Sequence, residues 1–176
     1  MKKILGIIIL IILVAIAFFL FLNRSKQTLK QPVLDDYKNS TYLVEGQQVT
    51  LVNGQSEVPV APGSASKIIT KYFGNEIEAD LNNDGFPDTA FIITQTSGGS
   101  GTFYYIVAAL KTTDGYQGTN AVVLGDRIAP QATEFKNGEL VVNYADRKPS
   151  QPMTTPPSVG ISRYFKIQGT SLIEVK

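Results

Sequence analysis

Hydrophobic and polar positions follow two patterns along this chain. From Ile4 to Leu22, nineteen consecutive residues carry neither a charge nor a strongly polar group, and such a run is long enough to cross a bilayer core as a helix. After a polar stretch, apolar residues return only in short runs separated by turn-forming residues, which is typical of strands. The pattern predicts a transmembrane anchor at 1–22, a polar linker at 23–40 and a β domain at 41–176.

Short strands and tight turns account for the domain's apolar runs. Glu45-Gly46 between Tyr42–Val44 and Val49–Val52 predicts a hairpin. Apolar and acidic residues alternate from Glu76 to Leu81, as in a half-buried strand. Phe103 to Leu110 is continuously apolar, which favours a strand buried on both faces.

The segment Ser64 to Phe73 can be interpreted in two ways. Pro62-Gly63-Ser64 resembles a helix cap, but Ile68-Ile69-Thr70 and Tyr72-Phe73 are β-formers, so we expect a strand. Ala90 to Thr94 predicts a further strand. The expected fold class is therefore all-β: an antiparallel meander that forms a sandwich, a strongly curled sheet or a barrel, preceded by one transmembrane helix.

Turn signals continue to the end of the chain. They lie at Asp114-Gly115, Gly125-Asp126, Asn137-Gly138 and Gly169. Four prolines between Lys148 and Gly160 disfavour strand pairing and predict an extended surface loop. Gly98 to Gly101 predicts a flexible hairpin end. We expect these two exposed loops to be the segments most able to present a binding surface.

The apolar N-terminal run has two interpretations. Ala15-Ile16-Ala17 offers a small-x-small cleavage site for a signal peptide, but Phe18 to Leu22 prolong the apolar run beyond it, which favours an uncleaved signal-anchor. Basic residues flank both sides of the run, so charge alone does not set its orientation. Because a short N-terminal anchor usually exports the domain that follows, we expect a single-pass protein of the cell membrane with an extracytoplasmic domain.

Composition excludes several classes of function. The chain contains no cysteine and no histidine, so it has no disulfide, no thiol nucleophile and no histidine-dependent catalysis. From residue 31 onward, 11 basic residues face 15 acidic ones, a formal charge of 11 − 15 = −4. Nucleic-acid binding depends on neutralising phosphates, so an acidic domain without a basic cluster predicts no nucleic-acid partner.

The segment from Asp80 to Asp88 has the spacing of a calcium loop. Oxygen-bearing side chains stand at its first, third, fifth and ninth positions, and a glycine stands at its sixth. The expected metal ligands are the side chains of Asp80, Asn82, Asp84 and Asp88, and the main-chain carbonyl of Phe86. The alternative is an acidic turn whose carboxylates are simply solvated. We expect a structural calcium ion, since three converging carboxylates repel one another without a cation.

Two resemblances extend this interpretation. The pattern Asp80-x-Asn82-x-Asp84-Gly85-x-x-Asp88 is similar to FG-GAP-type calcium loops, and more loosely to dockerins and EF-hands, although Phe91 replaces the EF-hand's twelfth-position glutamate. Val60 to Lys67, Gly98 to Tyr105 and Leu124 to Arg127 together resemble a family of uncharacterised membrane-anchored bacterial proteins. The second resemblance implies a bacterial envelope location and supplies no mechanism.

Catalytic interpretations have less support in the sequence. Ser64-Ala65-Ser66-Lys67 matches the Ser-x-x-Lys spacing of penicillin-interacting enzymes, but neither Ser-x-Asn nor Lys-Thr-Gly follows it. A glycosidase needs two carboxylates several ångströms apart, a separation that sequence does not reveal. The acids considered for such a pair are Glu76, Glu78, Asp114, Asp126, Glu134, Glu139 and Asp146.

A group of aromatic residues provides a further candidate surface. Phe103, Tyr104, Tyr105 and Tyr116 suit sugar stacking or protein binding, although core packing is the more frequent role of such side chains. Taken together, the sequence predicts a calcium-stabilised binding domain for a protein or glycan ligand. The alternative is a cell-envelope glycan hydrolase that uses a carboxylate pair.

Overall fold

A computed structural model of the protein describes residues 36–175. The predicted membrane helix and residues 23–35 of the predicted linker lie outside the described residues. Residues 36–175 contain no helix with the length and apolar character needed to span a bilayer. The described part is all-β, with antiparallel pairing between its strands and a single 3-10 turn at Tyr37–Asn39.

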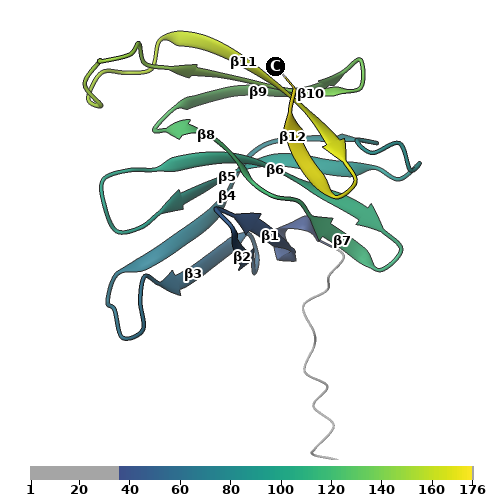
Figure 1. The fold of residues 1–176 in the computed structure, drawn as a ribbon, viewed down its shortest axis with the longest axis horizontal. Coiled ribbons are helices and arrows are strands. Elements are labelled where there is room, and N and C mark those ends of the chain that lie inside the picture. The colour runs from purple at the N-terminus through teal and green to yellow at the C-terminus, as the bar shows by residue number, and fades with distance from the viewer. Residues whose placement is uncertain (1–35, 176) are drawn as a thin grey trace, which may run out of the picture. The chain divides into compact units, whose positions relative to one another are not determined.

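The strands form three sheets (Figure 1). A hairpin comprises β1 (Thr41–Val44) and β2 (Gln47–Thr50). The largest sheet comprises β3 (Gln55–Pro59), β4 (Lys67–Ala79), β5 (Asp88–Thr96), β6 (Phe103–Thr112), β7 (Gly115–Gly118) and β8 (Val122–Asp126). The third sheet comprises β9 (Ala129–Lys136), β10 (Glu139–Asp146), β11 (Val159–Gln168) and β12 (Ser171–Glu174).

Strands that follow one another in the chain are mostly neighbours in the sheets. The largest sheet runs β3-β4-β5-β6-β7, and the four-stranded sheet runs β9-β10-β11-β12. The exception is β8, which pairs with β6 beyond the end of β7. A parallel bridge between Leu43 and Asn120 also joins the hairpin to the segment before β8. The expected antiparallel meander is therefore present, with one strand returning to an earlier partner.

Two hydrophobic cores lie on opposite faces of the largest sheet. The first is shared with the four-stranded sheet, and it includes Ile92, Ile106 and Phe165, all fully buried. The second lies under the hairpin, where Tyr42 and Val44 pack with Phe91. Strands β5 and β6 contribute side chains to both cores. The predicted burial of β6 on both faces holds from Tyr105 to Leu110, whereas Phe103 is exposed.

Several sequence predictions are confirmed in detail. Glu45 and Gly46 turn the β1–β2 hairpin with φ of 50° and 79°, left-handed values that suit a two-residue hairpin turn. The ambiguous segment is a strand, since β4 begins at Lys67. Leu81 is buried, and Ile77 packs against the first core, in keeping with the expected alternation.

Three boundaries differ from expectation. Gly125 and Asp126 complete β8, and the turn follows at Arg127, whose φ is 50°. The proline-rich loop ends at residue 158, because Gly160 pairs with Ala145 inside β11. Folded structure also starts before residue 41, since Tyr37 packs against the second core. In each case a long-range contact, which local composition does not encode, sets the boundary.

Candidate functional site

The predicted calcium loop joins β4 to β5 as an irregular segment, residues 80–87. Asp80 holds the loop closed, because its Oδ1 accepts the main-chain N–H of Asp84 (3.1 Å) and its Oδ2 accepts that of Gly85 (3.0 Å). Gly85 has φ of 88°, a left-handed value that favours glycine. Gly85 therefore makes the sharp turn that the spacing predicted, while Asp80, predicted as a metal ligand, closes the loop through main-chain hydrogen bonds.

The middle of the loop is organised by Asn82 and Asp84. The Asn82 Oδ1 accepts the main-chain N–H of Asp84 (3.0 Å), and the Asn82 Nδ2 donates to the Asp84 Oδ2 (2.8 Å). The Asp84 Oδ1 accepts the main-chain N–H of Phe86 (2.8 Å), and the Phe86 side chain is exposed. The side chains of positions three and five therefore contact each other directly.

Asp88, the ninth position, is fully buried at the start of β5. Its Oδ2 accepts the main-chain N–H of Leu81 (3.0 Å), and its Oδ1 accepts that of Lys111 (2.8 Å). Burial raises the pKa of this carboxyl above its ordinary value, the two hydrogen bonds oppose that rise, and the charges of Asp84 and Asp80 add to it. Asp88 thus anchors both ends of the loop and connects them to β6.

The loop's donor set suits a hard cation, because each engaged carboxylate oxygen keeps a second lone pair and the carbonyl of Phe86 adds a neutral oxygen. Besides burial, the negative charges of Asp80 and Asp84 raise the pKa of Asp88, and a bound cation would relieve this repulsion. Within residues 36–175, no three acidic side chains already stand in a metal-holding cluster.

A second candidate site lies at the opposite end of the β5–β6 hairpin. We call it the loop end and define it as residues 60–66, 97–102, 126–128 and 147–158. Segments 60–66 and 97–102 lie close together, because a Cβ added at Gly98 would be 3.7 Å from the Cβ of Ser66. Asp126 Oδ1 accepts the main-chain N–H of Thr102 (2.8 Å), and Arg127 donates its own main-chain N–H to the Thr102 carbonyl (2.8 Å).

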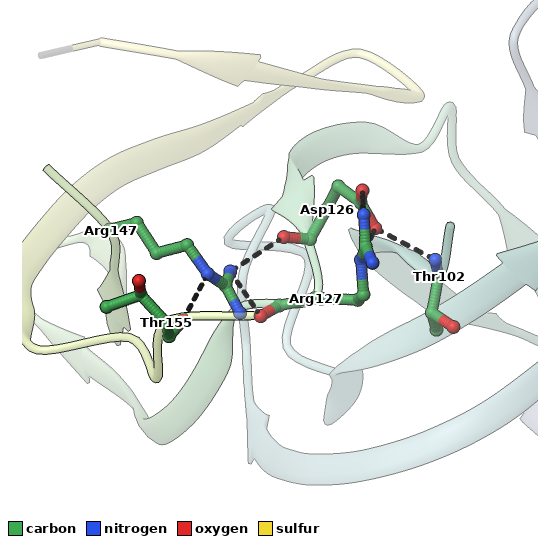
Figure 2. A network of polar contacts seen from close by, with 5 residues as sticks. All are labelled: Thr102, Asp126, Arg127, Arg147 and Thr155. Carbon is green, nitrogen blue, oxygen red and sulfur yellow. Dashed lines mark hydrogen bonds and ion pairs between the residues drawn. The ribbon is translucent and has the colours of Figure 1, made fainter. Parts of the chain in front are cut away.

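Two arginines complete the loop end (Figure 2). Arg127 forms an ion pair with Asp126, with 2.9 Å between Nη2 and Oδ2. Arg147 follows the end of β10. Its Nε donates to the Thr155 carbonyl (2.5 Å), and its Nη1 donates to the Arg127 carbonyl (2.9 Å). Burial would raise the pKa of Asp126, but hydrogen bonds from Arg127 and Thr102 and the charge of Arg147 outweigh it and lower that pKa. This network joins the glycine-rich and proline-rich loops.

The three longer loop-end segments are chemically uniform. Residues 60–66, 97–102 and 149–158 contain no charged side chain and are rich in serine, threonine, glycine and proline. The large apolar side chains of Val60 (49% exposed), Phe103 (41%, at the edge of this end) and Met153 (40%) are open to solvent. Interface centres are depleted in charge and enriched in aromatic residues and methionine, so this composition suits a contact surface.

Sequence reasoning identified the glycine-rich and proline-rich loops but missed that they meet. No local signal marks this connection: Gly125-Asp126 was interpreted as a turn, and its bond to Thr102 depends on strand pairing. Residues 60–67, 98–105 and 124–127, on which the resemblance to membrane-anchored bacterial proteins was based, all reach this end of the domain. Pairing of β8 with the first half of β6 brings them together.

The remaining candidates have ordinary structural contacts. Lys67 Nζ lies 2.9 Å from the Glu57 carboxylate, and the Ser64 hydroxyl accepts the main-chain N–H of Ser66, so Ser64 and Lys67 are not aligned as a nucleophile and base. Tyr105 is buried and donates to Glu45 (2.7 Å). Tyr104 packs edge-on against Phe73 with 5.2 Å between ring centroids.

Two of the acids considered for catalysis share a surface feature. Glu134 and Glu139 both line a shallow depression of about 340 Å3 on the outer face of the four-stranded sheet, beside Tyr164. Each carboxylate has a lysine partner: Lys136 at 2.8 Å from Glu134 and Lys166 at 3.5 Å from Glu139. Glu76 instead accepts hydrogen bonds from Tyr37 and Tyr72.

The described residues form an all-β domain with antiparallel sheets, and at its loop end residues 60–66, 97–102 and 149–158 carry no charge. Comparison of the chain with protein-family models, with curated proteins and with solved structures gave no match.

Proposed function

We propose that the protein is a membrane-anchored, calcium-stabilised extracytoplasmic domain that binds a protein or glycan ligand through its loop end. The single observation that carries this proposal is the hydrogen-bonded junction of Thr102, Asp126 and Arg147, which gathers uncharged loops from distant parts of the chain. Loops held by a rigid sheet are where binding residues are most often found.

The first described residues are packed onto the domain. Tyr37, the first residue of the 3-10 turn, packs against Phe91 (5.2 Å between ring centroids) and against Tyr116 of β7 (5.9 Å). Strand β7 pairs with the last residues of β6, which is the half of the sheet that carries the acidic loop.

Calcium at Asp80, Asn82, Asp84, Phe86 and Asp88 would have a structural role in this proposal. It would neutralise the loop's carboxylates and fix the corner between β4 and β5. The test is calorimetric titration of calcium into the EDTA-treated fragment 31–176, followed by thermal melts with and without the ion. We expect saturable binding and a raised Tm. An absence of both heat and Tm shift would reject the calcium site.

Ligand binding at the loop end needs its own test. A photo-crosslinking amino acid placed at Ser100 of the full-length protein in bacterial cells should yield a discrete adduct, and the same residue placed at Asp114 should not. Asp114 is a matched control because it is exposed in the turn at the other end of the β5–β6 hairpin. Equal labelling from the two positions, or none from Ser100, would contradict the proposal.

A glycan hydrolase remains the second candidate, because Glu134 and Glu139 line the same depression beside Tyr164. A hydrolase should release reducing ends from wall polysaccharide, and the release should be lost in both E134Q and E139Q. The lysine partners of both carboxylates are the reason why binding is preferred to hydrolysis. Turnover that persists in both variants would exclude this pair.

A further inference from the structure

Arg147 hydrogen-bonds both the proline-rich loop and the turn after β8. Within residues 36–175, it is the one side chain with hydrogen bonds to both segments. Its Nε donates to the Thr155 carbonyl, and its Nη1 donates to the Arg127 carbonyl at 2.9 Å and to the Asp126 carbonyl at 3.5 Å. Figure 2 shows the guanidinium lying between the two segments. The acceptors are main-chain oxygens, so the contact fixes backbone positions directly.

The turn that Arg147 contacts is itself bonded to the glycine-rich loop. Asp126 accepts the Thr102 N–H through Oδ1, and Arg127 donates its main-chain N–H to the Thr102 carbonyl. The contacts therefore run from Thr155 through Arg147 and the Asp126–Arg127 turn to Thr102. This series spans 53 residues of sequence, 155 − 102, with no strand pairing between the two loops themselves.

The chemistry of arginine suits this position. A planar guanidinium presents donors in fixed directions to several acceptors at once, whereas a lysine ammonium is a single compact charge on a flexible stem. The proline-rich loop has local bonds of its own, from the Thr155 N–H to the Pro152 carbonyl and from the Ser158 N–H to the Asp146 carbonyl. Those bonds shape the loop, but they do not place it relative to Thr102.

We propose that Arg147 is a positioning residue that holds the proline-rich loop and the glycine-rich loop in one fixed arrangement, so that the loop end meets its ligand as a preorganised surface. The purpose of this arrangement rests on the proposed binding function. A surface ordered before binding avoids much of the entropy cost that mobile loops would otherwise incur on association. The geometric part of the inference is testable on the protein alone.

The test is amide hydrogen exchange, measured by mass spectrometry on the full-length chain in detergent micelles. In R147K we expect exchange to accelerate by about tenfold at Thr155 and Ser158 and also at Thr102 and Arg127, with no change in the β5 and β6 core. The matched control is R163K, because Arg163 bonds Glu174 and the Val123 carbonyl outside the loop end. That variant should leave both loops unchanged.

The decisive measurement is whether R147K accelerates amide exchange at Thr102. Acceleration confined to residues 148–158, or no acceleration in either loop, would overturn the proposal. If R147K fails to fold, D126N tests the same connection from the other side, and its effect should reach Thr155. The exchange result does not depend on a ligand, so failure of the crosslinking test and failure of this inference are distinguishable.

Discussion

The Asp88 carboxylate accepts the Lys111 main-chain N–H at 2.8 Å, and this bond connects the acidic loop to the end of β6. The second carboxylate oxygen accepts the Leu81 N–H, so one buried side chain satisfies one donor in the loop and one on β6. The carboxylate can therefore support the corner between β4 and β5 with or without a bound ion.

Removing that carboxylate should destabilise the domain. D88A would leave the main-chain N–H groups of Leu81 and Lys111 without their acceptor, and we expect a loss of about 3 kcal/mol. Urea denaturation with linear extrapolation measures the change. D114A is the control, because this exposed turn residue should change stability by no more than about 0.5 kcal/mol. Equal stability of the two variants would contradict the anchoring role.

The raised pKa of Asp88 gives a pH dependence of definite sign. The folded state binds this proton more tightly than the unfolded state, whose carboxyl titrates near 3.8. The contribution of Asp88 to stability should therefore fall as pH rises from about 3.8 through its folded pKa and stay low above it. Other carboxyls titrate too, so the measurement is the stability difference between wild type and D88N in EDTA across this range. A difference that grows with pH would contradict the assignment.

Calcium affinity should depend on Asp84. D84A removes a carboxylate from the fifth position, and we expect the calcium Kd to rise at least about tenfold, with a smaller calcium-induced rise in Tm. Calorimetric titration of both proteins measures the difference, and D114A supplies a charge-matched control. Unchanged affinity in D84A would defeat the assignment of this loop as the binding site.

Gly118 should tolerate no side chain. A Cβ at this position would lie 2.2 Å from the Thr41 carbonyl oxygen and 2.7 Å from the Tyr42 ring, where the hairpin crosses β7. Because backbone must move to relieve that overlap, G118A should destabilise the domain by about 3 kcal/mol. G160A is the matched control, since a Cβ there meets nothing within 4 Å. Thermal or urea unfolding of the two variants tests the difference.

Local signals explain why much of the fold was predictable. The apolar run at Phe103 to Leu110 and the Glu45-Gly46 turn depend on neighbouring residues only. The turn is confirmed, and the run forms a strand that is buried from Tyr105 to Leu110 but exposed at Phe103. The internal hydrogen bonds of the acidic loop are equally local, since Asp80 bonds residues four and five positions away. Spacing alone therefore singled out these side chains, although as calcium ligands and not as hydrogen-bond partners of the main chain.

Long-range pairing explains what the sequence did not reveal. Asp126 and Thr102 are 24 positions apart, and they meet because β8 pairs with β6 after the intervening β7 hairpin. Lys111, the partner of Asp88, is 23 positions away. Neither contact has a local motif, so the loop end and the anchoring role of Asp88 emerge only from the arrangement of strands.

Strands β5 and β6 contribute side chains to both cores, so the two cores should unfold together. Since Phe91 and Ile92 are neighbours in sequence but face different cores, neither core can open without disturbing the strand that supports the other. The domain should therefore lose both cores in a single calorimetric transition. The amides at the centre of these two strands should be the last to exchange, at the free energy of global unfolding.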